Sequence, residues 1–215
     1  MRIAVVRPQP GADATAARLA ALGHVPLVHP LLATRARAWA LPDAPHDAII
    51  LSSAAAVRHA GPGADAVKAL PAHAVGAATA AAARAAGWAD VRTGPGTMQA
   101  LIDALPAGRF LHLAGADLTM ISLPDRISLS RVTVYETPLQ PLPGLIAAEA
   151  VLLHSPRTAS QFAAEWDRLG GARAAVALYA ISAATLAAAG AGWASAAAAP
   201  EPSEAALLAM LPKAE

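Results

Sequence analysis

The segment Ala74–Val91, AVGAATAAAARAAGWADV, predicts a short apolar strand, a turn, and a helix that opens at Thr79 and stops at a glycine. The same layout recurs in Leu178–Ser195, LYAISAATLAAAGAGWAS, with Thr185 at the corresponding helix start. The two threonines are 106 residues apart. Self-similarity of this kind indicates a duplicated structural unit, even in a chain as rich in alanine as this one.

The repeat extends to both sides of this segment. Upstream, DAIILSSAAAV at Asp47–Val57 matches EAVLLHSPRTA at Glu149–Ala159 with an offset of 102 residues. Downstream, TMQALIDAL at Thr97–Leu105 matches SEAALLAML at Ser203–Leu211 with an offset of 106 residues. A period of about a hundred residues with two copies is too long for a solenoid. The sequence therefore predicts two similar α/β domains.

The chain opens with a strand, a helix and a second strand. We expect the first strand at Arg2–Val6, a helix from an N-cap at Asp13 to Leu22, and the next strand at Val25–His29. This order is typical of a parallel sheet with a right-handed crossover. The second copy has no such beginning, so we expect the first domain to be discontinuous.

The predicted boundaries follow from that argument. The discontinuous domain covers residues 1–32 and 139–215, and the inserted domain covers residues 36–134. Connecting strands are expected near 31–39 and 131–139, forming a two-stranded hinge beside an interdomain cleft, and ligands commonly bind in such clefts. Other expected elements of the inserted domain include a helical remnant at Val67–Leu70, a strand at Arg109–Leu113 and a weak helix at Leu118–Ile127.

Composition excludes several classes of function. The 215 residues carry a formal net charge of +1 and include no cysteine, which excludes disulfides, thiolate catalysis and cysteine-ligated metals. The near-neutral charge argues against nucleic-acid binding. The N-terminus becomes polar too early for a signal peptide, and no run approaches the ~18 apolar residues of a membrane span. We therefore expect a cytoplasmic protein with neither nucleic-acid nor membrane partners.

Common catalytic patterns are also missing from the sequence. There is no GxxxxGK[ST] phosphate loop, and the seven histidines lack metal-ligand spacing such as HExxH, so no metal site is predicted. His154 precedes Ser155, but neighbouring residues of a strand point to opposite faces. Ser155 is therefore expected to be a turn residue and not half of a nucleophile pair.

Six short segments together resemble the uroporphyrinogen-III synthase family. They are Arg7-Pro8, IILSSAAAV at Ile49–Val57, AVGAATA at Ala74–Ala80, VTVYET at Val132–Thr137, VLLHSP at Val151–Pro156 and YAISAATL at Tyr179–Leu186. The resemblance implies two flavodoxin-like α/β domains joined by a two-stranded ladder, in agreement with the repeat. It also implies a monomeric lyase of heme biosynthesis that converts hydroxymethylbilane to uroporphyrinogen III, with inversion of ring D, loss of water and no metal or organic cofactor.

Tyr135 is the catalytic residue that the resemblance implies, because it matches the family's linker tyrosine. Loss of the substrate's hydroxyl gives an electrophilic azafulvene, and a weak acid beside that hydroxyl would assist its departure. The rest of the task is to hold a flexible substrate in position. The alternative is that Tyr135 only packs on a hinge strand, a position that suits aromatic rings.

The implied substrate bears many carboxylates, and the duplicated turns are the predicted anchors for them. Backbone N–H groups at helix N-termini bind anions, and the predicted N-termini follow Ser53, Gly76, Ser155 and Ser182. Thr79 and Thr185 are expected at helix starts, where N-capping and substrate contact are compatible. Arg7 is predicted to add a charged contact, with a solvated arginine as the alternative.

The sequence departs from the family's pattern at two places. FLHLAGAD at Phe110–Asp117 lacks the arginine that many relatives carry beside the glycine, so no carboxylate contact is assigned there. Ser182 stands where the first copy has Gly76, so the positive φ open to glycine is absent. The two copies are therefore expected to bind the substrate unequally.

Two other functions compete with the enzyme that the resemblance implies. A non-enzymatic two-lobed binding or sensor module is the main alternative, and such a module would be expected to carry an output domain beyond Glu215. A nucleotide- or sugar-handling enzyme is disfavoured by the missing phosphate loop.

Overall fold

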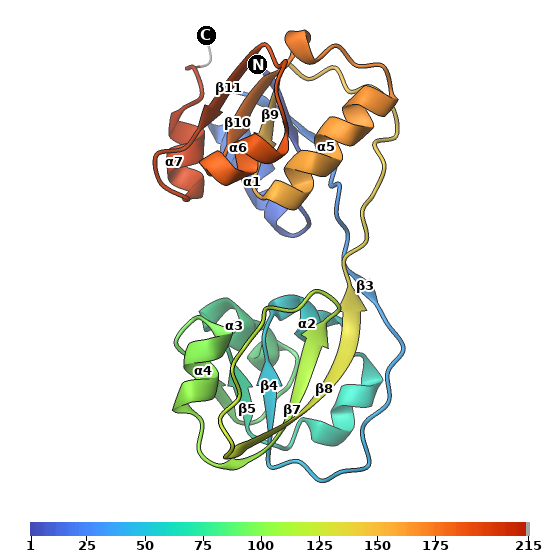
Figure 1. The fold of residues 1–215 in the computed structure, drawn as a ribbon, viewed down its shortest axis with the longest axis vertical. Helices are drawn as coiled ribbons and strands as arrows, with labels where there is room; N and C mark the ends of the chain where they lie inside the picture. The colour runs from blue at the N-terminus through green and yellow to red at the C-terminus, as the bar shows by residue number, and fades with distance from the viewer. Residues whose placement is uncertain (214–215) are drawn as a thin grey trace. The chain divides into compact units, whose positions relative to one another are not determined.

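A computed structural model describes residues 1–213, and the chain divides into two α/β units (Figure 1). Unit 1 consists of Met1–Ala33 and the chain from Pro138 onward, and unit 2 consists of Thr34–Thr137. Each unit has a parallel sheet with helices on both faces. The mixed α/β fold class expected from the repeat is confirmed.

Unit 1 contains five parallel strands in the order β2-β1-β9-β10-β11. This is the flavodoxin-like order 2-1-3-4-5. The strands are β1 (Arg2–Val5), β2 (Val25–Val28), β9 (Ala150–Leu153), β10 (Ala177–Ala180) and β11 (Ser195–Ala198). The helices are α1 (Gly11–Ala21), α5 (Pro156–Arg168), α6 (Ala183–Ala188) and α7 (Glu204–Ala209), with a 3-10 turn at Arg173–Ala175.

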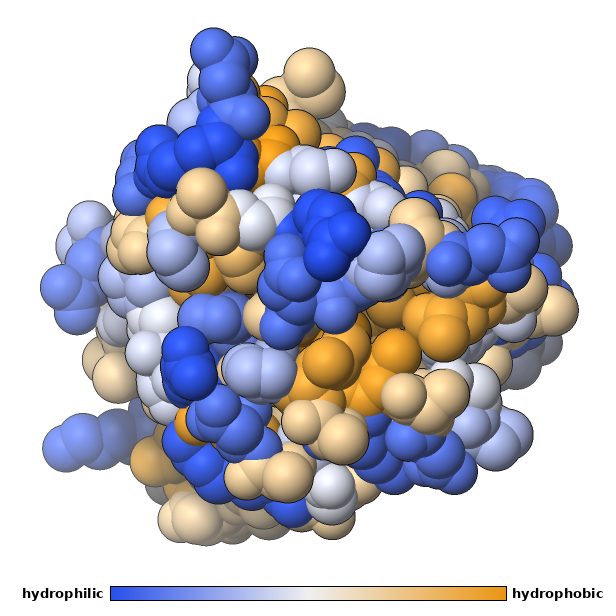
Figure 2. Space-filling view, turned by 90° about the horizontal axis from the view of Figure 1, so that it is seen from below, coloured by the Kyte–Doolittle hydropathy of each residue, from blue (hydrophilic) through white to orange (hydrophobic). Residues whose placement is uncertain are grey.

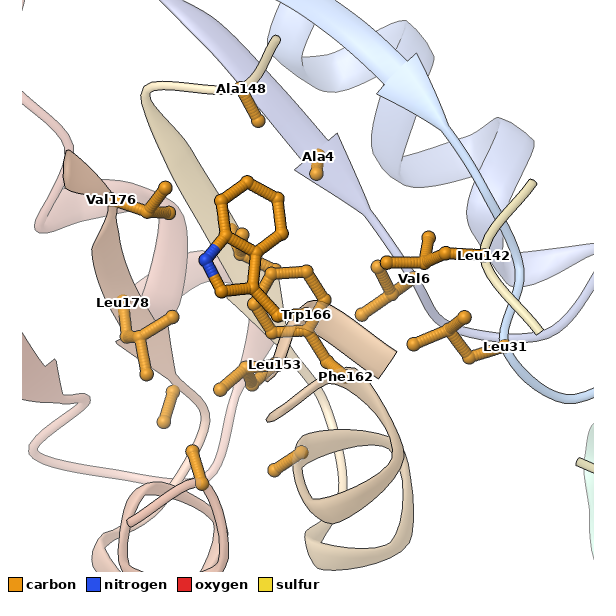
Figure 3. Packing of buried hydrophobic residues seen from close by; sticks show 14 residues of the cluster. Ala4, Val6, Leu31, Leu142, Ala148, Leu153, Phe162, Trp166, Val176 and Leu178 are labelled. Atoms are coloured by element: carbon orange, nitrogen blue, oxygen red, sulfur yellow. The ribbon is translucent and has the colours of Figure 1, made fainter. Parts of the chain in front are cut away.

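Aromatic side chains fill the core on the α5 and α6 side of this sheet (Figure 3). The rings of Phe162 and Trp166, both on α5, lie 5.5 Å apart. Leu31 and Leu142, from the two segments that lead toward unit 2, pack onto the same cluster. Burying a leucine side chain stabilises a fold by about 1.5–3 kcal/mol, so Leu31 and Leu142 hold both segments against unit 1.

Unit 2 contains six strands in the order β3-β8-β7-β4-β5-β6. All neighbours are parallel except β3, which pairs antiparallel with β8 at the edge. The strands are β3 (Arg35–Ala36), β4 (Ala48–Leu51), β5 (Ala72–Ala74), β6 (Val91–Thr93), β7 (Gly108–Gly115) and β8 (Ile127–Glu136). The helices are α2 (Ala54–His59), α3 (Ala77–Ala85) and α4 (Met98–Ala104), with a 3-10 helix at Pro62–Val67.

The two connecting segments pair antiparallel on both sides of the unit boundary. Arg35 pairs with Glu136 in the β3–β8 ladder, and Leu32 forms a bridge with Leu139. The guanidinium groups of Arg35 and Arg37 both form ion pairs with the Glu136 carboxylate, which they hold at a lowered pKa, Arg35 contributing more. The two segments are therefore joined by main-chain pairing at both of these points.

The two sheets are related by a permutation of the same strands. Asp47 N donates to Arg109 O at 2.8 Å, and Glu149 N donates to Arg2 O at 2.9 Å, so β4 and β7 correspond to β9 and β1. Both carboxylates also accept a hydrogen bond from the arginine's own backbone N–H. The β7–β8 crossover of unit 2 therefore corresponds to the β1–β2 crossover of unit 1, although the two crossovers lie in different parts of the sequence.

Three local predictions were wrong. No helix forms at Leu118–Ile127: residues 116–126 are irregular, because three apolar residues of the predicted helix are exposed and Pro124 interrupts the segment. The remnant predicted at Val67–Leu70 is a 3-10 helix that ends at Val67. Asp13 is not the N-cap of α1, because the helix already begins at Gly11, and Asp13 lies in the first turn, where a carboxylate is favoured by the helix dipole.

Candidate active site

Unit 2 has a cavity of about 470 Å³ at the carboxyl ends of its central strands. Ser52 and Ser53, which follow β4, line one side of it, and Gly115 at the end of β7 lines another. The order of strands reverses between β4 and β7, because the chain proceeds to β5 on one side and to β8 on the other. Ligands of open α/β sheets bind at this kind of switch point. The cavity is therefore the candidate active site of unit 2.

The irregular crossover between β7 and β8 forms the remaining wall. Residues 117–121 line the cavity, and Met120 is 93% exposed. In unit 1 the corresponding crossover carries α1, whose Leu19 is fully buried against the sheet. The missing helix thus leaves open the space beside β7 and β8.

Tyr135 lies in this cavity and its hydroxyl contacts Ser53. The two oxygens are 3.1 Å apart, and either can donate the hydrogen bond. The β7–β8 register shifts beyond Ala114, so that Gly115 pairs with Tyr135. A Cβ at Gly115 would lie 2.6 Å from the tyrosine ring, so the close approach of ring and strand requires glycine. Tyr135 and Ser53, predicted from separate motifs, are brought together here.

His59 supports the tyrosine from α2. The two rings stack with centroids 5.9 Å apart and an interplanar angle of 26°. His59 Nε2 lies 2.8 Å from Thr34 Oγ1, which orients the imidazole. Burial, and secondarily the Arg58 charge, lowers the pKa of His59, which favours the neutral ring at pH 7. Stacking and the Ser53 contact together limit the orientations that the tyrosine ring can adopt.

A second polar group on the same cavity was not found from the sequence. His112 Nε2 lies 2.8 Å from Ser52 Oγ, and Arg131 Nε donates to His112 Nδ1 at 3.4 Å. Burial lowers the pKa of His112 to about 4, with a smaller effect of the Arg131 charge, so the imidazole is neutral at pH 7. The available signal was a histidine in the otherwise apolar strand FLHLAG, but nothing local connects it to Ser52 or Arg131.

At the matching edge of unit 1, Ser155 is a turn residue, as predicted. Its hydroxyl caps α5 by accepting from Thr158 N at 3.2 Å. His154 precedes it, and neither ring nitrogen has a hydrogen-bond partner among the described residues. Burial lowers the pKa of His154 to about 4, with a smaller effect of the Arg7 charge.

The two threonines predicted at helix starts are not N-caps. Thr79 and Thr185 lie in the first turns of α3 and α6 and are buried. The N-cap of α6 is Ser182, whose Oγ accepts from Thr185 N at 3.2 Å, while Gly76 occupies the same place in α3 without a side-chain cap. The N-capping role expected of the two threonines is therefore wrong, whereas the helix N-termini expected after Gly76 and Ser182 are where the helices begin.

The expected contrast in backbone freedom between Gly76 and Ser182 is also wrong. Gly76 has φ −151° and Ser182 has φ −158°, both extended and open to any residue. The turns instead differ in their caps, because only serine provides a hydroxyl for the helix N–H group. The two anchors are therefore unequal for a different reason from the one predicted.

Arg7 is engaged within unit 1. Its Nη1 lies 3.3 Å from Glu204 Oε2 and donates to Thr15 Oγ1, also at 3.3 Å. Arg18 Nη1 forms an ion pair with the same Glu204 oxygen at 2.5 Å. The Arg7 guanidinium thus joins β1, α1 and α7, and its side chain remains 29% exposed.

The described residues show no group of three or more His, Asp or Glu side chains that could hold a metal ion. Within residues 1–213, no helix combines the length and apolar character needed to cross a bilayer. On the face shown in Figure 2, hydrophilic side chains interrupt the hydrophobic ones.

Comparison with solved structures shows where this fold has been seen before. The chain is similar to a uroporphyrinogen-III synthetase from Helicobacter pylori, with a TM-score of 0.63, 18% identity and 98% coverage of both chains. It is also similar to a mutant uroporphyrinogen III synthase from Thermus thermophilus, with a TM-score of 0.51, 19% identity, and coverage of 97% of this chain and 95% of the other. At these identities the likeness establishes the fold alone.

The family assignment rests on sequence. No curated protein matches the chain. The sequence model of the family described as Uroporphyrinogen-III synthase HemD matches residues 13–209, nearly the whole length. This match favours the enzyme over a two-lobed binding or sensor module. The chain therefore belongs to the uroporphyrinogen-III synthase family, a family of lyases in heme biosynthesis that act on hydroxymethylbilane.

Proposed function

We propose that this chain cyclises hydroxymethylbilane to uroporphyrinogen III, with Tyr135 as the acid that assists loss of the hydroxyl group. The observation that carries the proposal is the Tyr135 hydroxyl, held 3.1 Å from Ser53 Oγ on a cavity at the switch point of unit 2. A tyrosine hydroxyl can transfer a proton to a departing group. The family match over residues 13–209 supports the choice of substrate.

The proposed reaction begins with proton transfer from Tyr135 to the hydroxymethyl oxygen. The C–O bond breaks, water leaves, and electrons from the pyrrole nitrogen give the N-protonated azafulvene, a cation that balances the tyrosinate. The substituted carbon of ring D attacks this electrophile, and the resulting spiro intermediate fragments and recloses with ring D inverted. A proton lost from the new macrocycle returns to the tyrosinate. Ser53 can donate to that tyrosinate, which stabilises it in a partly buried site.

Carboxylate binding is proposed at the turns that precede four helices. Backbone N–H groups after Ser53, Gly76 and Ser182 are suited to anions because each begins a helix, and after Ser155 the first such group is that of Arg157, because Pro156 has none. Arg7, Thr79 and Thr185 are also proposed to contact the substrate. The threonines are buried and Arg7 is already paired with Glu204, so substrate contact would compete with interactions inside each unit.

We further propose a monomeric cytoplasmic enzyme without nucleic-acid or membrane partners and without a cofactor. The formal net charge of +1 supports the first exclusion, because nucleic-acid binding needs a strong positive field. The domains are proposed at the predicted boundaries of 1–32 with 139–215, and 36–134.

The test supplies hydroxymethylbilane and separates the uroporphyrinogen III and I isomers. The chain is expected to give isomer III, and isomer I in the proportion seen in buffer would refute the assignment. Tyr135→Phe is expected to lower kcat about 100-fold, in the range for loss of a general acid. Tyr179→Phe, on β10 of unit 1, removes the chain's other phenol and is the matched control. Equal turnover of the two variants would exclude Tyr135 as the acid.

A further inference from the structure

The polar pair beside the cavity of unit 2 occupies positions that are apolar in unit 1. His112 on β7 pairs in register with Arg131 on β8. By the correspondence of the sheets, the matching pair in unit 1 is Val5 with Val28, which lies beneath α1. The same fold in unit 1 therefore forms without a polar pair at this position of the sheet. A histidine and an arginine in unit 2 require a separate explanation.

The hydrogen bonds define which imidazole nitrogen carries the proton. Arg131 Nε can only donate, so the His112 Nδ1 that it contacts must be the acceptor. In a neutral ring the proton is then on Nε2, and Nε2–H donates to Ser52 Oγ at 2.8 Å. The pKa of His112, lowered to about 4 by burial and by Arg131, agrees with a neutral ring.

Because Ser52 Oγ accepts the hydrogen bond from His112, the hydroxyl proton of Ser52 remains available. Ser52 Oγ accepts from His112 and has no other hydrogen-bond partner among residues 1–213. Its O–H is therefore free to donate into the cavity that Ser52 lines. Arg131 lines the same cavity, is exposed, and has no carboxylate within ion-pair distance in the described chain. A hydroxyl donor beside an unpaired guanidinium is suited to a carboxylate.

We propose that His112 is a positioning residue that fixes the Ser52 hydroxyl as a hydrogen-bond donor, so that Ser52 and Arg131 together bind one carboxylate of the substrate. The proposal deepens the function proposed above and rests on it for the identity of the ligand. It also provides a cation beside β7 from the neighbouring strand, where the sequence FLHLAGAD offers none. Asp117 also lines the cavity, so the bound carboxylate has to lie on the Arg131 side.

The tautomer can be tested without any substrate. Nitrogen-15 NMR of the histidine-labelled protein at pH 7 is expected to show His112 as the neutral Nε2–H form, assigned by comparison with His112→Gln. In Arg131→Met the Nδ1 donor is lost, and the share of the Nδ1–H form is expected to rise. A wild-type His112 that is protonated on Nδ1, or doubly protonated, would overturn the proposal.

Kinetics tests the link between the histidine and the serine. Ser52→Ala and His112→Leu are each expected to raise KM for hydroxymethylbilane about 10-fold while kcat changes little, because they remove a binding contact that persists through the reaction. The double variant is expected to match the single ones, since His112 acts through Ser52. His112→Gln keeps an N–H near the position of Nε2 and is expected to restore most of the wild-type KM.

His73→Leu is the matched control. His73 is a buried histidine of the same sheet that lies on β5, contacts Phe110 and does not line this cavity. The KM of the His73→Leu variant is expected to stay at the wild-type value. Additive effects of Ser52→Ala and His112→Leu would overturn the proposal that His112 acts through Ser52, as would equal KM changes in His112→Leu and His73→Leu. A chain with the predicted tautomer but no isomer III activity would refute the proposed function, and with it a substrate carboxylate as the ligand.

Discussion

The β1–β2 crossover of unit 1 and the β7–β8 crossover of unit 2 join equivalent strands and cover them differently. In unit 1, α1 covers the strands and buries Leu19 against apolar residues. In unit 2, residues 116–126 are irregular, Met120 is exposed, and a cavity remains. This cavity therefore arises where a covering helix is missing, while the strands beneath it are parallel neighbours in both units.

The side chains beneath the two crossovers follow the same division. Val5 and Val28 lie under the helix, and His112 and Arg131 lie beside the cavity. The offset of 102 residues that aligns Ser53 with Ser155 also aligns Ser52 with His154. His154 of unit 1 and His112 of unit 2 both lie at this end of their sheets, but of these two only His112 is hydrogen-bonded to a neighbouring side chain among the described residues.

The largest expected effect comes from truncating the crossovers themselves. Leu19→Ala should lower the free energy of unfolding of unit 1 by about 2–5 kcal/mol, because a fully buried leucine leaves a cavity. Ile121→Ala, in the half-buried crossover of unit 2, should cost about 1 kcal/mol. Urea unfolding followed by tryptophan fluorescence measures both losses, since Trp166 and Trp193 lie in unit 1 and Trp39 and Trp88 lie in unit 2. Equal losses would mean that both crossovers are core elements.

The sequence predicted the fold because the repeat retains the residues that build strands and helices. The apolar runs AIIL and AVLL form the central strands β4 and β9, and all of their residues are buried. The family and fold class followed from these segments and are confirmed. The predicted helix at Leu118–Ile127 failed because most of its apolar residues do not meet a sheet, and a cavity cannot be read from hydrophobic periodicity.

The candidate site was predicted only in part. Tyr135 and Ser53 were named from their motifs, yet their contact spans 82 positions and depends on the register shift at Gly115. Ser52, His112 and Arg131 were missed because they are far apart in sequence and only the pairing of β4, β7 and β8 brings them together. Hydrogen bonds between distant strands are a property of register, which a single sequence does not specify in such detail.

The two histidines should make each unit sensitive to acid. A pKa lowered to about 4 from an unfolded value of about 6.5 means that the unfolded chain binds more protons between these limits. Stability is therefore full above pH 6.5 and falls as the pH drops to 4, by on the order of 3 kcal/mol for each histidine.

Urea unfolding at a series of pH values measures this loss. His112→Gln should flatten the dependence in unit 2, as reported by Trp39 and Trp88, and His154→Gln should flatten it in unit 1. Carboxylates also titrate in this range, so the comparison is between each variant and the wild type. An unchanged slope in either variant would mean that its histidine has the same pKa in the folded and the unfolded protein.

Gly115→Ala should disturb the end of β7 next to the cavity. The new Cβ would lie 2.6 Å from the ring of Tyr135, so the ring or the strand has to move. We expect a loss of about 1–3 kcal/mol in stability, as for overpacking, and a lower kcat because the tyrosine hydroxyl is displaced. Gly144→Ala is the control, since no atom lies within 4 Å of its added Cβ. Wild-type turnover in Gly115→Ala would show that the position of the Tyr135 ring is not critical.

The smallest expected effect is at His154, and it has the opposite sign from the others. Both ring nitrogens are buried without a hydrogen-bond partner among the described residues, and such groups cost about 1–3 kcal/mol. His154→Leu should therefore raise the free energy of unfolding of unit 1 at pH 7 by about 1 kcal/mol, measured by urea unfolding.

His112→Leu should instead lower the free energy of unfolding of unit 2 by about 1 kcal/mol, because it removes a partner from both Ser52 and Arg131. If His154→Leu were destabilising, the imidazole would have to be satisfied by an ordered water, and the contrast between the two histidines would disappear. If the variant were more stable but turned over hydroxymethylbilane more slowly, an unsatisfied buried histidine would be tolerated in unit 1 for the sake of the reaction.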